Sequence, residues 1–317
     1  MSNREIMEYD VVIVGAGPSG LSTAIKIKQL CLKNQKDMSI CIVEKGSEVG
    51  SHILSGAVIE TKSLDELIPN WRETDIPLNT KASTDRFLYL TKNKSIRLPT
   101  PPQMKNHGNY IVSLGKLCKW LATYAENLGV EIYPGFSASE ILFDSEGSVT
   151  GVATNDMGIS KDGTKGPNFE PGIELKAKQT IFSEGCRGHL GKIINKKFNL
   201  DKNCQPQTYA IGIKELWEVD EEKHIPGTIL HTTGWPLNKE TYGGSFLYHF
   251  DKNLISIGFV IGLDYKNPYL SPYEEFQQYK HHPEIKKYLD GGIRIGYGAR
   301  ALNEGGYQSL PKLSFPG

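Results

Sequence analysis

Residues 10–20 read Asp10-Val-Val-Ile-Val-Gly-Ala-Gly-Pro-Ser-Gly20, and this stretch decides the fold of the first part of the chain. An apolar, β-branched run ends in G-x-G-x-x-G, and a segment with helical spacing, 21–32, follows directly. In such a context the first glycine permits a tight turn, the second admits a pyrophosphate, and the third lets helix and strand pack closely. A purely structural glycine turn is the alternative. We predict a dinucleotide site that includes Gly15, Gly17, Pro18, Ser19 and Gly20.

The end of the second strand supports this prediction. Residues 39–43 form a buried strand, and Glu44 follows it, where a carboxylate accepts hydrogen bonds from ribose hydroxyls and disfavours a 2′-phosphate. FAD is favoured over NAD because an irregular segment, 45–59, follows instead of another strand and helix. A later strand that ends at a glycine turn, 183–188, is also spaced for a split domain.

Further along, the pattern predicts a first domain interrupted by a second. Helical spacing over 113–128, a strand at 130–133 and a hairpin over 141–154 continue the first domain, and the glycine-rich stretch 156–172 is expected to be a loop. From residue 208 onward, several strand-like runs predict an antiparallel sheet. The predicted fold is α/β with an α+β insertion. A Rossmann-like FAD-binding domain of the glutathione-reductase type (1–206) is interrupted by an antiparallel-sheet domain (207–292) and resumes, truncated, at 293–317.

Composition excludes several classes of protein. The chain has 317 residues with 36 basic and 36 acidic side chains, so its charge gives no reason to expect a nucleic-acid partner. No apolar run approaches the roughly 20 residues that cross a bilayer, and the first ten residues lack a signal or transit pattern. The chain is therefore expected to begin here, on a cytoplasmic or matrix side. The five scattered cysteines contain no C-x-x-C pair, which argues against a zinc or four-thiolate site within these residues.

Four longer motifs extend the evidence beyond the glycine turn. They are Gly50-Ser-His-Ile-Leu-Ser-Gly-Ala57, Tyr242-Gly-Gly-Ser-Phe-Leu-Tyr-His249, Gly258-Phe-Val-Ile-Gly-Leu-Asp-Tyr-Lys-Asn-Pro-Tyr-Leu-Ser-Pro272 and Tyr297-Gly-Ala-Arg-Ala-Leu-Asn-Glu-Gly-Gly306. With the opening turn, they resemble the electron-transfer-flavoprotein:ubiquinone oxidoreductase family over essentially the whole chain. The resemblance implies FAD, a quinone-binding inserted domain, and electron passage from reduced electron-transfer flavoprotein to ubiquinone at a membrane surface. It also implies one 4Fe-4S cluster, whose cysteines lie in a C-terminal ferredoxin-like domain that this chain does not contain.

The resemblance also implies individual site residues. Gly243 and Gly244 match the family's quinone-contacting pair, and Tyr242 and Phe246 are expected to line the same pocket; a β-bulge and plain core aromatics are the alternatives. Asn303 is expected to hydrogen-bond the flavin edge and tune its potential, unless it is a loop amide that caps a turn. The remaining expected FAD contacts are Lys45, Gly50, Leu54, Ser55, Gly56, Gly185, Arg187 and Gly305.

The apolar segment 49–69 matches the part of the family that enters one leaflet of the membrane, although its spacing fits a buried helix equally well. The protein is accordingly expected to be peripheral or monotopic on the inner membrane, at the cytoplasmic face in bacteria or the matrix face in mitochondria. Two alternatives for the function stay open. One is a related hydroxylase or polyprenyl reductase that uses NAD(P)H, and the other is a catalytically silent flavin-binding remnant.

Overall fold

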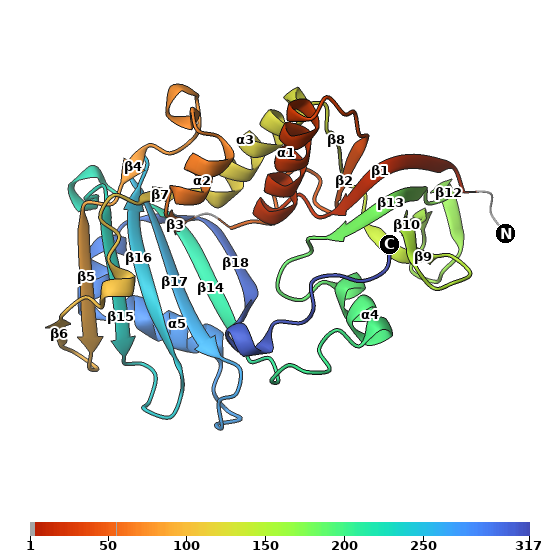
Figure 1. Ribbon diagram of the computed structural model, residues 1–317. Helices are drawn as coiled ribbons and strands as arrows, with labels where there is room; N and C mark the ends of the chain where they lie inside the picture. The colour runs from red at the N-terminus through yellow and green to blue at the C-terminus, as the bar shows by residue number, and fades with distance from the viewer. Residues whose placement is uncertain (1–3, 55) are drawn as a thin grey trace. The chain divides into compact units, whose positions relative to one another are not determined.

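The computed structural model describes residues 4–54 and 56–317, which form two compact units. The first unit comprises Met1–His52, Cys118–Cys204 and Pro311–Gly317. The second comprises Ile53–Leu117 and Gln205–Leu310. Each unit is therefore built from segments that are far apart in the sequence (Figure 1).

The first unit is built on a six-stranded sheet. In sheet order its strands are β8 (Glu131–Pro134), β2 (Ile40–Glu44), β1 (Ile6–Val14), β13 (Glu174–Phe182), β10 (Val149–Thr154) and β9 (Ala138–Phe143). The first four run parallel, and β10 and β9 form an antiparallel hairpin at one edge. Chain order runs outward from β1 to β2 and β8 on one side, whereas the neighbour on the other side, β13, enters the sheet only after the β9–β10 hairpin. The order of the strands therefore changes direction between β1 and β13, and doubly wound sheets bind ligands at such a switch point.

Helices cover both faces of this sheet. Gly20 in α1 (Pro18–Lys33) lies close to Ile13, while Leu190 in α4 (His189–Phe198) packs in a buried cluster with Val12 and Val14. Since successive residues of a strand point to opposite faces, α1 and α4 lie on opposite sides of β1. Helix α3 (Leu114–Asn127) leads into β8, and a separate antiparallel pair consists of β11 (Met157–Ile159) and β12 (Lys165–Glu170).

A seven-stranded sheet dominates the second unit. In sheet order its strands are β18 (Ile293–Asn303), β14 (Tyr209–Glu218), β17 (Leu254–Gly262), β16 (Gly243–Phe250), β15 (Thr228–Gly234), β5 (Thr84–Leu90) and β6 (Ser95–Leu98). All neighbouring strands are antiparallel except β15 and β5. A three-stranded sheet is formed by β3 (Ala57–Ile59), β7 (Tyr110–Val112) and β4 (Thr80–Lys81). Short 3-10 turns lie at Trp71–Glu73, Pro102–Met104, Glu221–Lys223 and Tyr307–Ser309.

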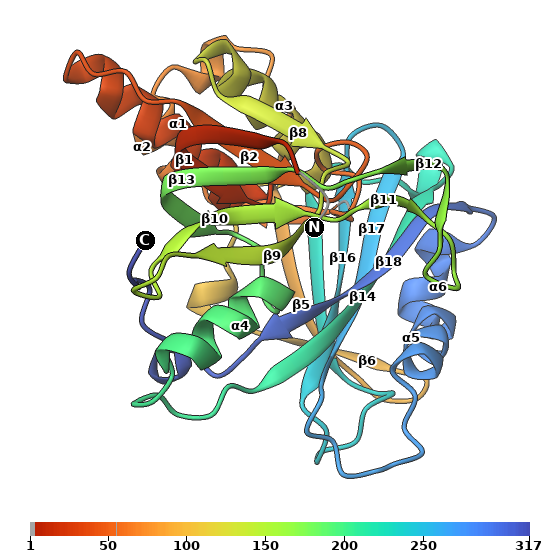
Figure 2. The ribbon, with the colours of Figure 1, turned by 90° about the vertical axis from the view of Figure 1, so that its right-hand side faces the viewer.

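The two faces of the large sheet are covered differently. Helices α5 (Pro272–His281) and α6 (Pro283–Leu289) cover one face, where Phe276 and Tyr279 pack on Ile257 and Phe259 (Figure 2). On the opposite face, Phe250 packs with Ile111 of the small sheet. The unit also holds α2 (Lys62–Leu67). Among residues 4–54 and 56–317, no helix is both long and apolar enough to span a bilayer.

The predicted fold class is confirmed, and the structure differs from the sequence expectation in two places. The expectation of a loop at 156–172 is wrong, because β11 and β12 pair there through backbone hydrogen bonds without a clear apolar alternation to announce them. The predicted boundaries also differ from the compact units. Residues 53–117 group with the second unit because β5 and β6 extend its large sheet, and β18 at 293–303 pairs with β14 of the same sheet.

Candidate functional site

The glycine turn after β1 is held by close backbone packing. Gly15 has φ +105°, and a Cβ there would collide with the carbonyl of Ser183. A Cβ on Gly20 would collide with the carbonyl of Gly15. Both positions therefore require glycine for the fold itself, one for the turn and one for the approach of α1 to the strand.

Gly17 is different, because nothing lies within 4 Å of the position that its Cβ would occupy. It is the N-cap of α1 in an extended conformation with φ −80°, which any residue adopts. Among the residues that the structure describes, no side chain caps this helix, and its first turn holds no acidic residue. The N-terminus of α1 is thus an open end with helix-dipole charge and space beside it, which suits an anionic group.

The carboxylate of Glu44 holds the turn from the neighbouring strand. Its Oε2 accepts a hydrogen bond from the N–H of Ala16 at 3.0 Å, and its Oε1 accepts one from the N–H of Gly46 at 2.7 Å. A carboxylate has about four lone-pair sites, so it retains capacity for ribose hydroxyls. The Cys118 thiol lies beside it, and burial, followed by the negative charge of Glu44, raises the pKa of Cys118 to about 12.

The second glycine turn lies at the end of β13. The N–H of Ser183 donates to the carbonyl of Val14 at 2.8 Å, which places this turn next to the first one. Gly185 has φ +84° and is exposed, as is Arg187. The N-terminus of α4 that follows is closed, because Glu184 accepts a hydrogen bond from the N–H of Gly191 at 2.6 Å.

The structure thus brings together, within the first unit, the part of the predicted FAD site that lies at the carboxyl ends of three parallel strands. Gly15 follows β1 and contacts the ends of the other two strands. Its N–H donates to the carbonyl of Val43 in β2 at 2.8 Å, and its Cα faces Ser183, which follows β13. Lys45 is exposed, and Gly50 takes φ +88° in the turn that follows.

The other predicted FAD contacts belong to the second unit, except Ser55, which lies outside the described residues. Gly56 has φ +90°, and a Cβ there would collide with the side chain of Ser256. Leu54 lies over Gly296 and Gly298 of β18, about 4 Å from the positions of their missing Cβ atoms. Gly56 is also bound by Lys214, whose Nζ donates to its carbonyl at 2.9 Å.

The residues at the C-terminal end of β18 lie in a turn of the second unit. Asn303 is the exposed last residue of β18, paired with Tyr209. The N–H of Gly305 donates to Gln207 Oε1 at 2.7 Å, and a Cβ on Gly305 would collide with Ser309. Gly305 therefore has a structural reason to be glycine as well as a predicted contact with FAD.

The predicted quinone residues lie at the start of β16. Gly243 and Gly244 pair with Ile261 and Val260 in unbroken register, so the pair is regular strand and not a β-bulge. As neighbours in a strand they face opposite sides of the sheet. A Cβ on Gly243 would meet Leu237 at 2.6 Å, whereas Gly244 lies on the same face as Phe246.

Two aromatic residues accompany this pair. Tyr242 is 69% exposed, and the Phe246 ring stacks on Tyr248 with 4.5 Å between centroids. The Phe246 ring also occupies the space that a side chain at Gly258 would need, so Gly258 is required there. Sequence reasoning included neither Gly258 nor Lys214 in the site. Gly258 opens one of the quoted motifs but was given no role there, and Lys214 lies in none of them.

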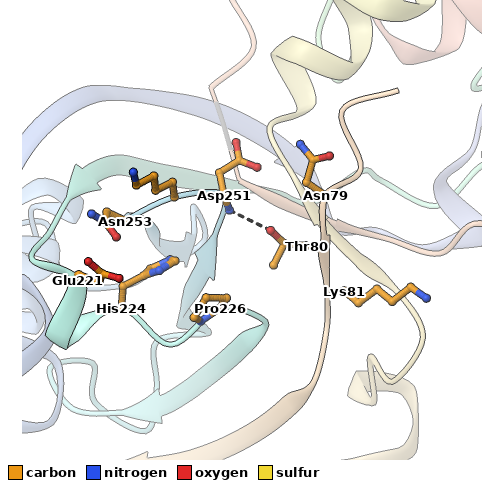
Figure 3. A pocket seen from close by; sticks show the side chains of 9 residues that line it. Asn79, Thr80, Lys81, Glu221, His224, Pro226, Asp251 and Asn253 are labelled. Atoms are coloured by element: carbon orange, nitrogen blue, oxygen red, sulfur yellow. Dashed lines mark hydrogen bonds between the residues drawn. The ribbon is translucent and has the colours of Figure 1, made fainter. Parts of the chain in front are cut away.

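A cavity of about 770 Å³ lies elsewhere in the second unit (Figure 3). Asn79, Lys81, His224 and Asp251 are among its lining residues, and the N–H of Asp251 donates to Thr80 Oγ1 at 2.9 Å. None of the predicted site residues that the structure describes lines it. Among the residues described, no cluster of three or more histidine, cysteine, aspartate or glutamate side chains is arranged to bind a metal.

Solved structures share this architecture. A geranylgeranyl bacteriochlorophyll reductase-like protein from Thermoplasma acidophilum superposes with a TM-score of 0.66 at 17% identity, covering 94% of this chain and 66% of that chain. A flavin-dependent brominase gives a TM-score of 0.59 at 17% identity, covering 94% of this chain and 67% of that one. At this identity the likeness defines the fold, which is that of FAD-dependent oxidoreductases and halogenases.

Sequence comparison is more specific. Residues 12–133 match an FAD-NAD(P)-binding family model, and residues 209–302 match a model described as ETF-QO, ubiquinone-binding. A mitochondrial electron transfer flavoprotein-ubiquinone oxidoreductase from Dictyostelium discoideum is 59% identical over 99% of this chain and 52% of its own length. The Sus scrofa protein of that name is 58% identical over 98% of this chain and 51% of its own length. The chain belongs to the electron transfer flavoprotein-ubiquinone oxidoreductase family and spans about half the length of these relatives.

Proposed function

We propose that this chain forms the FAD- and quinone-binding part of an enzyme that passes electrons from reduced electron-transfer flavoprotein to ubiquinone. The names of the curated relatives and the ubiquinone-binding match at 209–302 support this function. The observation that carries the proposal is the uncapped N-terminus of α1, with open space at Gly17 and the carboxylate of Glu44 beside it.

The first unit presents groups whose chemistry suits FAD. The N-terminal N–H groups of α1 bind the pyrophosphate, Gly17 leaves room for it, and Glu44 accepts ribose hydroxyls. FAD, when bound, supplies the electron transfer itself. The other contacts in this proposal are Pro18, Ser19, Lys45, Gly50, Leu54, Gly56, Gly185, Arg187 and Gly305, with Asn303 as a donor to the flavin edge.

In the second unit, the exposed Tyr242, the backbone of Gly243 and Gly244, and the Phe246 ring are the proposed quinone contacts. An aromatic ring and backbone without Cβ atoms suit a flat, apolar ligand. Reduction of the quinone to the quinol takes two electrons and two protons, and the protons come from solvent.

We also propose that segment 49–69 contacts the membrane, but only some of its apolar side chains can do so. Leu64 is 8% exposed and Ile68 is fully buried in the second unit, so these two side chains contribute to a core. Val58 also packs against the cluster that holds Ile111 and Phe250, so among the apolar residues of the segment half-buried ones such as Ile53 and Ile59 remain for a lipid surface. The expected place is the matrix face of the inner mitochondrial membrane, or the cytoplasmic face in bacteria. The 4Fe-4S cluster is proposed for the longer protein, outside the residues described.

The test uses purified protein reconstituted with FAD. We expect about one FAD per chain, and we expect anaerobically photoreduced flavin to regain its absorbance when a short-chain ubiquinone is added. Rapid bleaching of oxidised flavin by NADPH would instead favour the hydroxylase or polyprenyl reductase alternative. A chain that binds FAD but never passes electrons to quinone would favour the silent remnant, and a chain that binds no FAD would contradict the whole proposal.

A further inference from the structure

A lysine lies between two glycines on the face of the large sheet that points away from α5 and α6. Lys214 of β14 pairs directly with Gly258 of β17 and with Gly298 of β18. Directly paired residues of neighbouring strands point to the same face. The Phe246 ring lies over Gly258 and the Leu54 side chain lies over Gly298, so the lysine is flanked by an aromatic ring and an aliphatic chain.

The charge of this lysine has no carboxylate partner among the residues the structure describes. Its Nζ donates to the carbonyl of Gly56 at 2.9 Å and lies 5.3 Å from the centroid of the Phe246 ring. An ammonium has three donors, so two remain after the bond to Gly56. Burial lowers the pKa of Lys214, which reflects the cost of keeping this cation away from water.

On the opposite face of the same strand, a partly buried lysine is paired with a carboxylate. There Lys280 of α5 donates to both carboxylate oxygens of Glu215 at 2.9 Å, and Glu215 is 2% exposed. A partly buried cation that lacks such a carboxylate loses hydration without an ionic partner and is suited to an anionic or strongly accepting ligand. We therefore expect Lys214 to bind a ligand in addition to the carbonyl of Gly56.

The residues around Lys214 are those of the proposed function. Leu54 and Gly56 are proposed FAD contacts, and Phe246 is a proposed quinone contact. The flavin ring and the quinone ring both carry carbonyl oxygens that gain negative charge when the ring takes up electrons. We propose that Lys214 donates a hydrogen bond to such a ring carbonyl oxygen and stabilises the charge that it gains; this inference rests on the proposed function.

Three variants of the full chain separate charge from structure. Lys214→Arg keeps the cation, Lys214→Gln keeps a donor for Gly56 but removes the charge, and Lys214→Met fits the same apolar surroundings and serves if the glutamine variant fails to fold. Lys116→Gln is the matched control, since Lys116 is exposed and pairs with Asp251. FAD content and thermal melting are measured first, and then the flavin midpoint potential and the KM for a short-chain ubiquinone.

Loss of the charge is expected to change either the flavin midpoint potential or the quinone KM, and the quantity that changes identifies which ring Lys214 binds. If the oxygen belongs to the flavin, the glutamine and methionine variants lower the midpoint potential and leave the quinone KM unchanged. If it belongs to the quinone, the KM rises by roughly ten- to a hundredfold, as expected for one charge-assisted hydrogen bond, and the potential stays the same. The arginine variant stays close to wild type in both.

Unchanged potential and unchanged KM in a folded, FAD-loaded glutamine or methionine variant would overturn the inference while the proposed function stands. A wild-type chain that holds no FAD or reduces no quinone would instead refute the proposed function. A variant in which only the melting temperature falls, and which the arginine variant does not rescue, would reduce Lys214 to a structural anchor for Gly56.

Discussion

Two helices of the first unit begin at glycine turns that follow parallel strands, and their N-termini are in opposite states. At α1 the N-cap is Gly17, with open space beside it and no acidic side chain in the first turn. At α4 the N-cap is Gly188, and Glu184 bends back to accept hydrogen bonds from the N–H groups of Leu190 and Gly191. A Cβ on Gly188 would collide with the Glu184 side chain.

The difference shows that a glycine turn before a helix can end in two ways: the helix N-terminus is either capped by the chain or left open. At α4 the chain satisfies the helix end with its own carboxylate, so the turn is complete without a ligand. At α1 the neighbouring carboxylate of Glu44 accepts hydrogen bonds from the N–H groups of Ala16 and Gly46 and leaves the helix end open. The N-terminus of α1 therefore stays available to an anionic ligand, and the pyrophosphate of the proposed FAD suits it.

The largest effect on FAD affinity is expected from Gly17→Asp, which gives the N-terminus of α1 its own carboxylate, as α4 already has. We expect FAD affinity to fall by about a hundredfold or more, since a carboxylate then competes for the helix end and repels the phosphates. The apo protein should keep its stability to within about 0.5 kcal/mol, because aspartate is a good N-cap and the position has room. Fluorescence titration with FAD and thermal melting measure the two effects.

The neutral Gly17→Asn is the matched control for this substitution. It has the same size and caps a helix equally well, but it adds no charge. We expect it to bind FAD at least tenfold more tightly than the aspartate variant. Equal losses in the two variants would show that bulk, and not charge, closes the site.

A smaller effect is expected from Glu44→Gln. This substitution tests whether the carboxylate of Glu44 binds a ligand, in contrast to that of Glu184, which caps α4. An amide keeps one acceptor for Ala16 or Gly46 but loses the charge-assisted bonds to ribose hydroxyls. We expect FAD affinity to fall roughly tenfold to thirtyfold. Titration with FAD against FMN, which lacks the adenosine, checks the assignment, because FMN binding should be unaffected.

The smallest effect is expected at α4. Glu184→Ala opens that helix end and should cost about 1 kcal/mol of unfolding free energy, within the range measured for lost helix caps. FAD affinity should stay within about twofold of wild type, since the phosphates bind α1. Urea denaturation gives the first quantity. A large loss of FAD with normal stability would show that the second turn, and not the first, holds the phosphates.

Local pattern predicted the part of the site that local contacts build. The strand, the turn at Gly15–Gly20 and Glu44 follow one another within the first 44 residues, and each is recognisable from its neighbours. The role of Glu184 was not recognisable, because this carboxylate lies seven residues before Gly191 in the sequence and ahead of the N-cap Gly188, outside any capping motif.

Long-range pairing explains what the sequence did not predict about the second unit. Residues 53–117 read as an irregular part of the first domain, but β5 pairs with β15, which follows it by more than a hundred residues. The direction of Lys214 depends equally on the partners that β14 selects, Gly258 and Gly298. Neither relation leaves a trace in local periodicity.

The most direct test of the central claim is a ¹H–¹⁵N spectrum of the isotopically labelled chain, recorded without and with FAD. Binding of the pyrophosphate at α1 predicts the largest amide shifts at Gly17, Ser19 and Gly20, and small shifts at Leu190 and Gly191, whose N–H groups Glu184 already binds. Large shifts at the N-terminus of α4 with none at α1, or no shifts at either helix with saturating FAD, would contradict the account.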